Sequence, residues 1–313
     1  MSRIGRRSFL RTAAGAALGA GLGSAFTPQQ GGLVFAEETV NNTIPTRRLG
    51  KIGYEATIFS LGAGGNTPIM DLEQRDTGVA IVNRALDLGV NYIDTAASYG
   101  GGDSEVIVGD VMQDRREEVF LATKTRQRTA EGLRENEFEQ SCERLQTDYI
   151  DLYYFHAVHT IDDLDTVLDR DNGPVTVFEQ LREEGRIGNI GISSHSSATL
   201  MEAMDRYDFD CVFVTVNPAG LSMNDPDNLR DMLAMAQEKD IGTVAMKIPA
   251  RGGVLDRGIT MEESLGYALS LPFATANIGI SSVEILEENV ELAKAFTPLD
   301  DEKLTQLEER ARS

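Results

Sequence analysis

Four polar residues lie near the ends of three neighbouring strand-like runs, and their side-chain types suit proton transfer. They are Asp94, Tyr99, Lys124 and His156, with Asp94 and Tyr99 five positions apart in NYIDTAASYGGGDSE. A phenol has an ordinary pKa of about 10 and is a poor acid at neutral pH. A neighbouring ammonium favours the phenolate and lowers that pKa, and a carboxylate keeps a buried ammonium charged.

Together these groups make an acid tuned by an ion pair, with an imidazole to orient a substrate oxygen. Such a set can protonate that oxygen while the carbonyl carbon receives hydride. Protein side chains do not supply hydride, so the chemistry requires a nicotinamide cofactor. Singly, each residue has a plainer interpretation: a helix-capping Asp94, a solvated Lys124 and a core His156. Only their joint placement favours a catalytic set.

The elements that position these residues alternate between short β-rich runs and longer amphipathic ones. The predicted strands are 57–63, 91–96, 119–124, 149–156, 188–194, 211–217, 241–247 and 276–281. This alternation predicts parallel strands with right-handed crossovers, and eight units in about 250 residues is the size of a closed (β/α)8 TIM barrel. The site of such a barrel lies at the C-terminal strand ends. The alternative is an open doubly wound sheet, which the absence of a GxGxxG motif disfavours.

Segments outside the strands complete the predicted domain. Alternation at 47–57 predicts an N-terminal β-hairpin that closes the bottom of the barrel, and 298–313 is expected to form a final helix. The glycines after Tyr99 are expected to turn the backbone so that Tyr99 faces inward, with the next helix beginning near Asp103. We interpret 157–173 as a long acidic loop, which disfavours anionic substrates near it.

The order of these motifs resembles the aldo-keto reductase superfamily over roughly residues 46–295. The motifs that carry the resemblance are NYIDTAASYGGGDSE (91–105), ATK (122–124) and DYIDLYYFH (148–156), with support from EGRIGNIGIS (184–193) and EILEENVELA (284–293). The resemblance implies NAD(P)H-dependent reduction of an aldehyde or ketone, or the reverse reaction. It implies Tyr99 as the general acid, Lys124 and Asp94 as the groups that tune it, and His156 as the orienter of the carbonyl.

The resemblance also implies where the cofactor, NADP or NAD, would bind. The implied positions are Ser193, Ser194 and Asn217 on the carboxamide side, Lys247 and the 247–255 loop at the pyrophosphate, and Glu288 with Asn289 at the adenine end. Phe213 and Val216 stand where the family usually has a glutamine and an aromatic ring that stacks on the nicotinamide. Serines and acids follow the eighth strand, where NADP-preferring members carry Lys or Arg, and this favours NAD.

Particular residues leave other functions possible. Lys247 could be a Schiff-base lysine, although no acid–base partner specific to aldolase chemistry is present. His156, His159 and His195 share one end of the predicted barrel, but the family uses no metal and none is predicted. Glycoside hydrolysis needs two facing carboxylates, which the strand ends do not supply. The main alternative is a barrel that binds nicotinamide without turnover and serves as a sensor or partner subunit.

The first 36 residues differ from the rest and predict a targeting segment. Arg6 and Arg7 form a twin-arginine pair, and a mild Gly/Ala-rich apolar stretch follows up to a cleavage point after Ala36. This pattern predicts export by the twin-arginine machinery to the periplasm or cell exterior, although an uncut membrane tether is the alternative. The predicted organisation is a signal at 1–36, a linker at 37–45 and one barrel domain at 46–313.

Charge and cysteine content narrow the remaining partners. The net charge of −21 makes nucleic acid an unsuitable partner because a phosphate backbone would be repelled. Cys142 and Cys211 lie in apolar segments without a CxxC spacing, so we expect two packed core thiols rather than a metal site. A small carbonyl compound and the nicotinamide cofactor are the expected ligands, and we expect a monomer.

Overall fold

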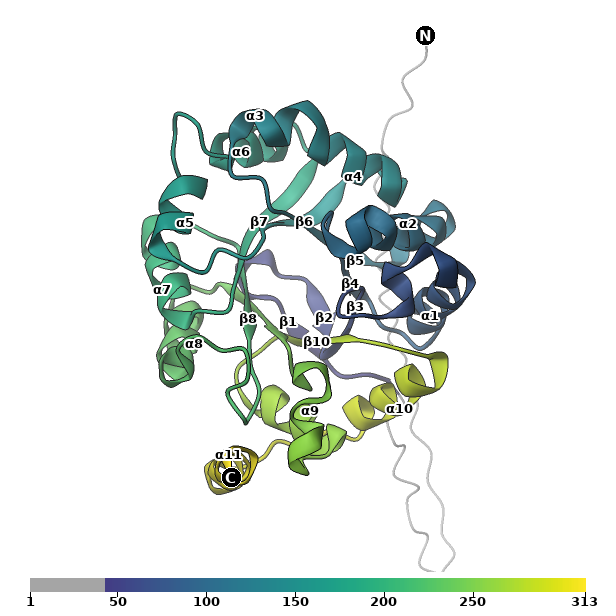
Figure 1. Ribbon diagram of the computed structural model, residues 1–313, viewed down its shortest axis with the longest axis vertical. Coiled ribbons are helices and arrows are strands. Elements are labelled where there is room, and N and C mark those ends of the chain that lie inside the picture. Colours follow the sequence, from purple (N-terminus) through teal and green to yellow (C-terminus); the bar gives the residue numbers. More distant parts are fainter. Residues whose placement is uncertain (1–42) are drawn as a thin grey trace, which may run out of the picture. The chain divides into compact units, whose positions relative to one another are not determined.

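Eight parallel strands close into a barrel in the computed structural model, which describes residues 43–313 (Figure 1). The strands, in barrel order, are β3 (Phe59–Gly62), β4 (Tyr92–Asp94), β5 (Phe120–Thr125), β6 (Ile150–Phe155), β7 (Ile187–Ser194), β8 (Cys211–Thr215), β9 (Gly242–Met246) and β10 (Thr275–Gly279). β10 pairs with β3 and closes the ring. The predicted (β/α)8 barrel and its eight strands are confirmed. The predicted signal segment and most of the predicted linker lie outside the described residues.

Helices surround the barrel in alternation with the strands (Figure 1). They are α1 (Arg75–Asp87), α2 (Asp103–Arg115), α3 (Ala130–Gly132), which continues through a π-helical turn (Leu133–Glu137) into α4 (Phe138–Leu145), α5 (Ile161–Val167), α6 (Val175–Glu183), α7 (Ser197–Arg206), α8 (Leu229–Glu238), α9 (Met261–Ser270), α10 (Val283–Lys294) and α11 (Asp301–Arg312). Among the described residues, no helix has the length and apolar character needed to cross a membrane.

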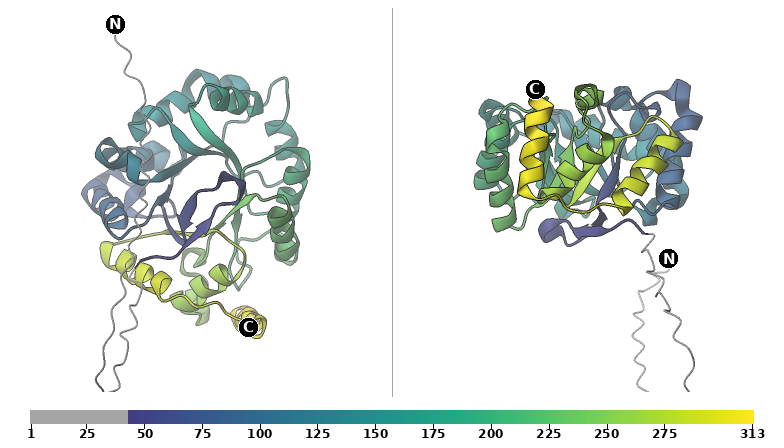
Figure 2. Two further views of the ribbon diagram at one scale, coloured as in Figure 1. Left: turned by 180° about the vertical axis from the view of Figure 1, so that it is seen from behind. Right: turned by 90° about the horizontal axis from the view of Figure 1, so that it is seen from below.

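The predicted hairpin is present as β1 (Thr46–Arg48) paired antiparallel with β2 (Glu55–Thr57). It lies across one end of the barrel, as the left panel of Figure 2 shows. Leu49, between its two strands, is fully buried among the apolar side chains of the barrel interior. Burial of this side chain holds the hairpin against the barrel and closes that end.

Two apolar layers follow from the two-residue period of the strands. Alternate residues of the same strands point inward and fill the barrel, including Tyr92, Phe120, Leu152, Tyr154 and Phe213. The outward-facing residues pack against the helices in a larger cluster. Both cysteines are buried and free, Cys142 in the outer layer and Cys211 in the inner one, so the prediction of core thiols is confirmed.

The segment between β4 and α2 turns as the sequence predicted. Gly100, Gly101 and Gly102 all have positive φ, at 58°, 68° and 110°. A Cβ on Gly100 would lie 2.2 Å from the carbonyl oxygen of Met70. Three successive left-handed residues reverse the chain immediately after Tyr99, and α2 begins at Asp103.

The segment 157–173 is not wholly a loop, because it contains α5. Thr160 and Asp163 form a reciprocal capping box at the start of this helix. That pattern is a sequence signal for a helix start. Its acidic side chains belong to the outer surface of α5 and the turn that follows, and none of them lines the cavities at the barrel mouth described below.

Candidate active site

A buried ion pair lies at the C-terminal end of the barrel interior. The Lys124 ammonium donates to the carboxylate Oδ1 of Asp94 and to the carbonyl oxygen of Thr95, the latter at 2.7 Å. Lys124 and Asp94 are each 1% exposed. The strand period explains this position, since Phe120, Ala122 and Lys124 form one inward-facing row on β5.

Burial controls the ionisation of Asp94. It raises the pKa of this carboxyl to about 6, against the opposing attraction of Lys124. Its second oxygen, Oδ2, is buried without a hydrogen-bond partner among the described residues. Buried carboxylate oxygens are normally paired, so this atom is open to a donor from a bound molecule.

Tyr99 lies beside the ion pair. The Lys124 nitrogen is 4.9 Å from the centre of the Tyr99 ring. Burial raises the pKa of the Tyr99 phenol above its ordinary value, whereas the charge and hydrogen bond of Lys124 lower it. The sequence-based expectation of a lowered pKa is correct for the contribution of Lys124, but burial outweighs that contribution. The phenol is therefore protonated at neutral pH and can act as a proton donor.

His156 follows β6 and lies beside Tyr99. The two rings are edge to face with centroids 5.6 Å apart, and Nδ1 of His156 lies 3.4 Å from the hydroxyl of Ser98. Burial lowers the pKa of His156 to about 2, and the nearby charge of Lys124 adds to this effect. The imidazole is neutral, so it can orient a substrate oxygen by a hydrogen bond without itself supplying the proton.

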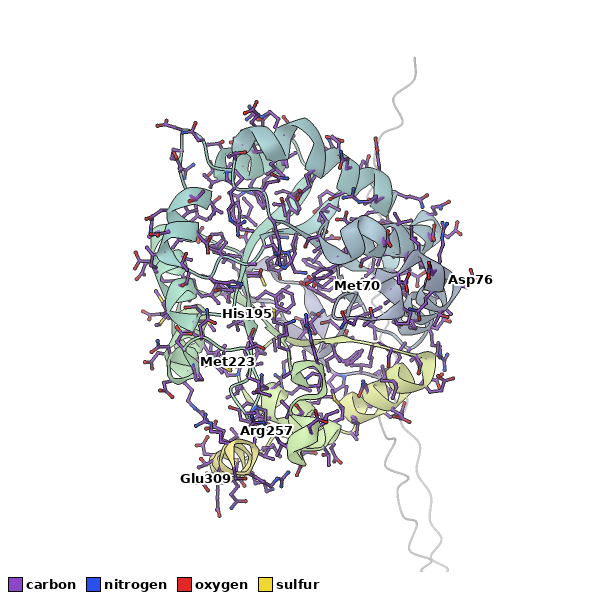
Figure 3. All side chains as sticks on the ribbon, viewed as in Figure 1. Met70, Asp76, His195, Met223, Arg257 and Glu309 are labelled. Atoms are coloured by element: carbon purple, nitrogen blue, oxygen red, sulfur yellow. The ribbon has the colours of Figure 1, made fainter. Side chains whose placement is uncertain are left out.

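Two adjoining cavities open at this end of the barrel and meet at Tyr99. The narrow cavity, of about 120 Å³, is lined by residues that include Asp94, Tyr99, Phe213, Lys247 and Arg251. The wide cavity, of about 400 Å³, is lined by Ser98, Tyr99, Lys124, Arg126, His156, Ser193, Lys247, Arg251 and neighbours such as Met70 and His195. Met70 and His195, two residues that line the wide cavity, lie apart from each other at the barrel opening (Figure 3). Larger hollows at α9–α11 and at the hairpin end contain none of the four predicted catalytic residues.

The cofactor positions implied by the resemblance divide into two groups. Ser193 and Lys247 line the wide cavity, and Lys247 lines the narrow one as well. Ser194 is fully buried, and its hydroxyl accepts from the backbone N–H of Ser196 at 3.0 Å. The Asn217 amide is engaged with the Leu221 backbone at 2.9 Å in both directions. Ser194 and Asn217 therefore brace loops in this structure rather than face the cavities.

The remaining implied positions lie on helix α10. Glu288 is exposed and Asn289 is buried, and neither lines the two cavities. Phe213 of β8 and Val216, directly after it, stand where the family usually has a glutamine and a stacking aromatic ring. Val216 is fully buried away from both cavities, whereas the ring of Phe213 lines the narrow one.

Among the cationic residues of the site, the sequence reasoning missed Arg126 and included Arg251 only as part of the 247–255 loop. Arg126 and Arg251 line the wide cavity together with Lys124 and Lys247. Arg126 continues the inward-facing row of β5 two residues beyond Lys124, so the strand period was an available signal. No Asp or Glu lines this cavity. The acidic residues of 157–173 are thus absent from the lining of this cavity, and the expectation that they disfavour anionic substrates near them stays a prediction.

Backbone strain concentrates in the loops around the cavities. Asn66, Ala157, Lys247, Ala250 and Arg251 all have positive φ without being glycine. Such conformations are uncommon for residues with a side chain, and they cluster at functional sites. Lys247 and Arg251 are thus held at the barrel mouth by a turn that their own side chains disfavour.

Gly64 provides a test of how the Tyr99 ring is positioned. A Cβ at Gly64 would lie 2.6 Å from Cε2 and 2.9 Å from Cζ of Tyr99, and Gly64 itself does not have positive φ. We expect Gly64→Ala to displace the ring and to lower kcat about tenfold or more, since displacements of about 1 Å are costly in catalysis. Steady-state kinetics checks this, with Gly266→Ala in α9 as the control for a glycine change, because Gly266 also lacks positive φ and its Cβ would meet only Leu299, at 3.7 Å or more. An unchanged kcat in Gly64→Ala would show that the ring position is not critical.

The site fits a nicotinamide dinucleotide. Asp94 Oδ2 has no hydrogen-bond donor among the described residues. Ser193 lies on the wall of the wide cavity, where its hydroxyl accepts from the Ala157 N–H at 2.9 Å. Lys247 and Arg251, which line both cavities, suit a pyrophosphate. Among the described residues no group of His, Cys, Asp and Glu is arranged to hold a metal ion.

The chain belongs to the aldo/keto reductase family, whose model matches residues 61–267. It is 27% identical over 304 residues to L-galactose dehydrogenase of Arabidopsis thaliana, covering 85% of this chain and 93% of that protein. The aldo-keto reductase AKR11C1 of Bacillus halodurans in its holo form has 26% identity and a TM-score of 0.69, with 86% and 96% of the two chains covered. An aldo-keto reductase of Klebsiella pneumoniae in complex with NADPH shares the fold, with 23% identity, a TM-score of 0.69 and the same coverage. The chain is an NAD(P)-dependent oxidoreductase that interconverts a carbonyl compound and an alcohol.

Proposed function

We propose that this enzyme reduces its aldehyde or ketone with Tyr99 as the general acid. The observation that carries this assignment is the buried Lys124–Asp94 ion pair, whose ammonium lies 4.9 Å from the Tyr99 ring at the junction of the two cavities. A bound nicotinamide supplies the hydride. The residues of the chain supply the proton and the electrostatic environment for it.

Each residue has one task in this proposal. The Tyr99 hydroxyl donates its proton to the carbonyl oxygen, and the Lys124 charge stabilises the phenolate that remains. Asp94 keeps Lys124 charged in its buried position. Ser98 donates to Nδ1 of His156, so that Nε2 carries the proton and hydrogen-bonds the same carbonyl oxygen. In alcohol oxidation, Tyr99 accepts the proton instead.

Multiple turnover distinguishes this enzyme from a nicotinamide-binding barrel without turnover. The measurement is oxidation of NADH or NADPH by the purified protein with a panel of aldehydes, with the alcohol product identified by NMR. We expect many product molecules per protein molecule. Tight cofactor binding with at most one product per protein molecule would support the sensor or partner-subunit alternative.

For the cofactor, we propose a preference for NAD over NADP. Ser282, after β10, caps α10 by accepting from the Ile285 N–H at 3.3 Å, and Glu284, Glu287 and Glu288 follow on the same helix. Arg84 of α1 reaches this helix but is paired with Glu287 at 2.6 Å. A 2′-phosphate would meet acids here without a free cationic partner. Fluorescence titration with NADH and NADPH tests the preference, and tighter NADPH binding would contradict it.

For location, we propose export by the twin-arginine machinery with cleavage after Ala36. The support is the Arg6–Arg7 pair ahead of the mild apolar stretch in residues 1–36. This route carries folded proteins, which suits an enzyme that binds its cofactor before export. Cell fractionation and N-terminal mass spectrometry should find a mature protein that begins at Glu37, and Arg6→Lys with Arg7→Lys should retain the precursor in the cytoplasm. Normal export of that variant would contradict the proposal.

A further inference from the structure

We propose that the natural substrate of this enzyme is anionic, a carbonyl compound with a carboxylate or phosphate group that Arg126 binds. This inference rests on the proposed function and extends it to the substrate class. Its starting observation is the sign of the charge at the barrel mouth, which is opposite to that of the protein as a whole.

The wide cavity collects positive charge in a strongly acidic chain. The net charge of the chain is −21, yet Lys124, Arg126, Lys247 and Arg251 line this cavity and no carboxylate does. A concave site lined by one sign of charge concentrates ligands of the opposite sign and raises their association rate. In a chain with this net charge, the cavity is therefore a local place where an anion is stabilised.

Three of these cations are not neutralised by the protein. Lys124 is paired with Asp94, but Arg126, Lys247 and Arg251 form no ion pair within residues 43–313. Burial lowers the pKa of Lys247, and the charges of Arg251 and Lys124 lower it further. Most arginines elsewhere in the structure, such as Arg75 and Arg186, are matched with carboxylates. A cluster of unmatched cations in one cavity is expected where the counter-charge comes with the ligands.

Position separates Arg126 from the other two. Lys247 and Arg251 line both cavities and suit the cofactor pyrophosphate. Arg126 lines only the wide cavity, on the strand that carries Lys124, and its charge acts on Tyr99, His156 and His159. It is thus close to the residues that would hold the carbonyl oxygen. A guanidinium in this position can bind a carboxylate or phosphate in a bidentate manner while the carbonyl faces Tyr99.

The nicotinamide cofactor supplies the hydride that the proposed reaction consumes. The carbonyl carbon of the anionic substrate gains hydride from NAD(P)H, its oxygen gains the Tyr99 proton, and the products are the hydroxy acid or hydroxy phosphate and NAD(P)⁺. The anionic group itself does not react. Its attachment to Arg126 orients the carbonyl, which is a specificity role rather than a chemical one.

The test compares an anion with a neutral molecule of the same carbon skeleton. The first pair is 4-formylbenzoate and 4-formylbenzamide, and the second is glyceraldehyde 3-phosphate and glyceraldehyde, so that carboxylate and phosphate preferences are measured separately. We expect kcat/KM to favour the anion in at least one pair. Arg126→Gln should lower the anion-to-neutral ratio by about tenfold or more, and Arg126→Lys should restore part of it. Arg312→Gln, on the exposed face of α11, is the matched control that should leave the ratio unchanged.

A binding measurement keeps this test separate from the proposed catalytic function. Calorimetry with 4-(hydroxymethyl)benzoate and its amide, on protein loaded with reduced cofactor, reports the anion site without any turnover, because an alcohol cannot accept hydride. Anion-selective binding that is lost in Arg126→Gln supports the site even where a chosen aldehyde is not reduced. Equal binding of acid and amide, or a selectivity that Arg126→Gln leaves intact, overturns the inference, while reduction of the neutral aldehydes would still support the proposed function.

Discussion

Replacing Tyr99 with phenylalanine is expected to lower kcat for carbonyl reduction by about 10²–10⁴-fold, the usual contribution of a positioned general acid. The change removes only the hydroxyl. The ring keeps its places 4.9 Å from the Lys124 nitrogen and 5.6 Å from the His156 ring, so the shape of both cavities is retained. Because the substrate loses its proton donor and not its binding surface, the loss should fall on kcat and leave the Kd of the cofactor nearly unchanged. Steady-state kinetics and cofactor fluorescence titration measure the two quantities separately.

Tyr149→Phe is the matched control for this substitution. Tyr149 is 38% exposed and lies directly before β6, at the end of the strand opposite to His156. Its loss of a hydroxyl should leave kcat within about twofold, in line with the small effects of surface substitutions. A Tyr99→Phe protein that turns over at the wild-type rate would remove Tyr99 as the proton donor, and loss of cofactor affinity in that variant would instead indicate a structural role.

The inward-facing positions of the strands could be predicted because their period is two. On β5 the same rule that buries Phe120 and Ala122 brings Lys124 to the barrel mouth. On β4 it turns Asp94 inward, opposite Ala122 of the neighbouring strand β5 and two residues before Lys124. The fold and the catalytic cluster could therefore both be predicted from the sequence, since both depend on which residues of a strand face inward.

Loop residues were harder to assign because their direction depends on local hydrogen bonds. Ser194 and Asn217 stand at the right strand ends, yet their polar atoms are taken by the Ser196 N–H and the Leu221 backbone. Short polar side chains satisfy nearby backbone groups as readily as ligands. The raised pKa of Tyr99 could not be predicted either, because it depends on the depth of burial, which follows from loops packed over the mouth and not from residue spacing.

Replacing Lys124 with methionine is expected to lower the free energy of unfolding by about 3–5 kcal/mol, the usual cost of removing one partner from a buried pair. The Lys124 nitrogen lies 5.1 Å from the centre of the Phe213 ring, and methionine keeps much of the apolar stem of the lysine. The carboxylate of Asp94 is therefore the main group left unsatisfied. Catalysis should be lost as well, since the ammonium that most strongly stabilises the Tyr99 phenolate is gone and only the weaker effect of Arg126 remains. Urea unfolding followed by circular dichroism measures the stability change.

The pH dependence of that loss identifies its cause. Asp94 already has a pKa of about 6 with Lys124 present, and its attraction to Lys124 lowers that value, so the pKa must rise further in Lys124→Met. A carboxyl whose folded pKa exceeds its unfolded value of about 3.9 takes up its proton first in the folded state, which stabilises the fold as the pH falls. The stability gap between wild type and Lys124→Met should therefore narrow from pH 8 to pH 5.5.

Adding Asp94→Asn to Lys124→Met separates stability from chemistry. The double variant removes the unpaired charge, so we expect it to regain much of the lost stability at pH 8 and to show little of the pH dependence of the single variant. It should remain inactive because the ammonium beside Tyr99 is still missing. A double variant as unstable as Lys124→Met would assign the loss to packing of the methionine. Recovery of turnover in the double variant would show that Tyr99 can donate its proton without the Lys124 ammonium, which would remove the electrostatic basis of the proposed site.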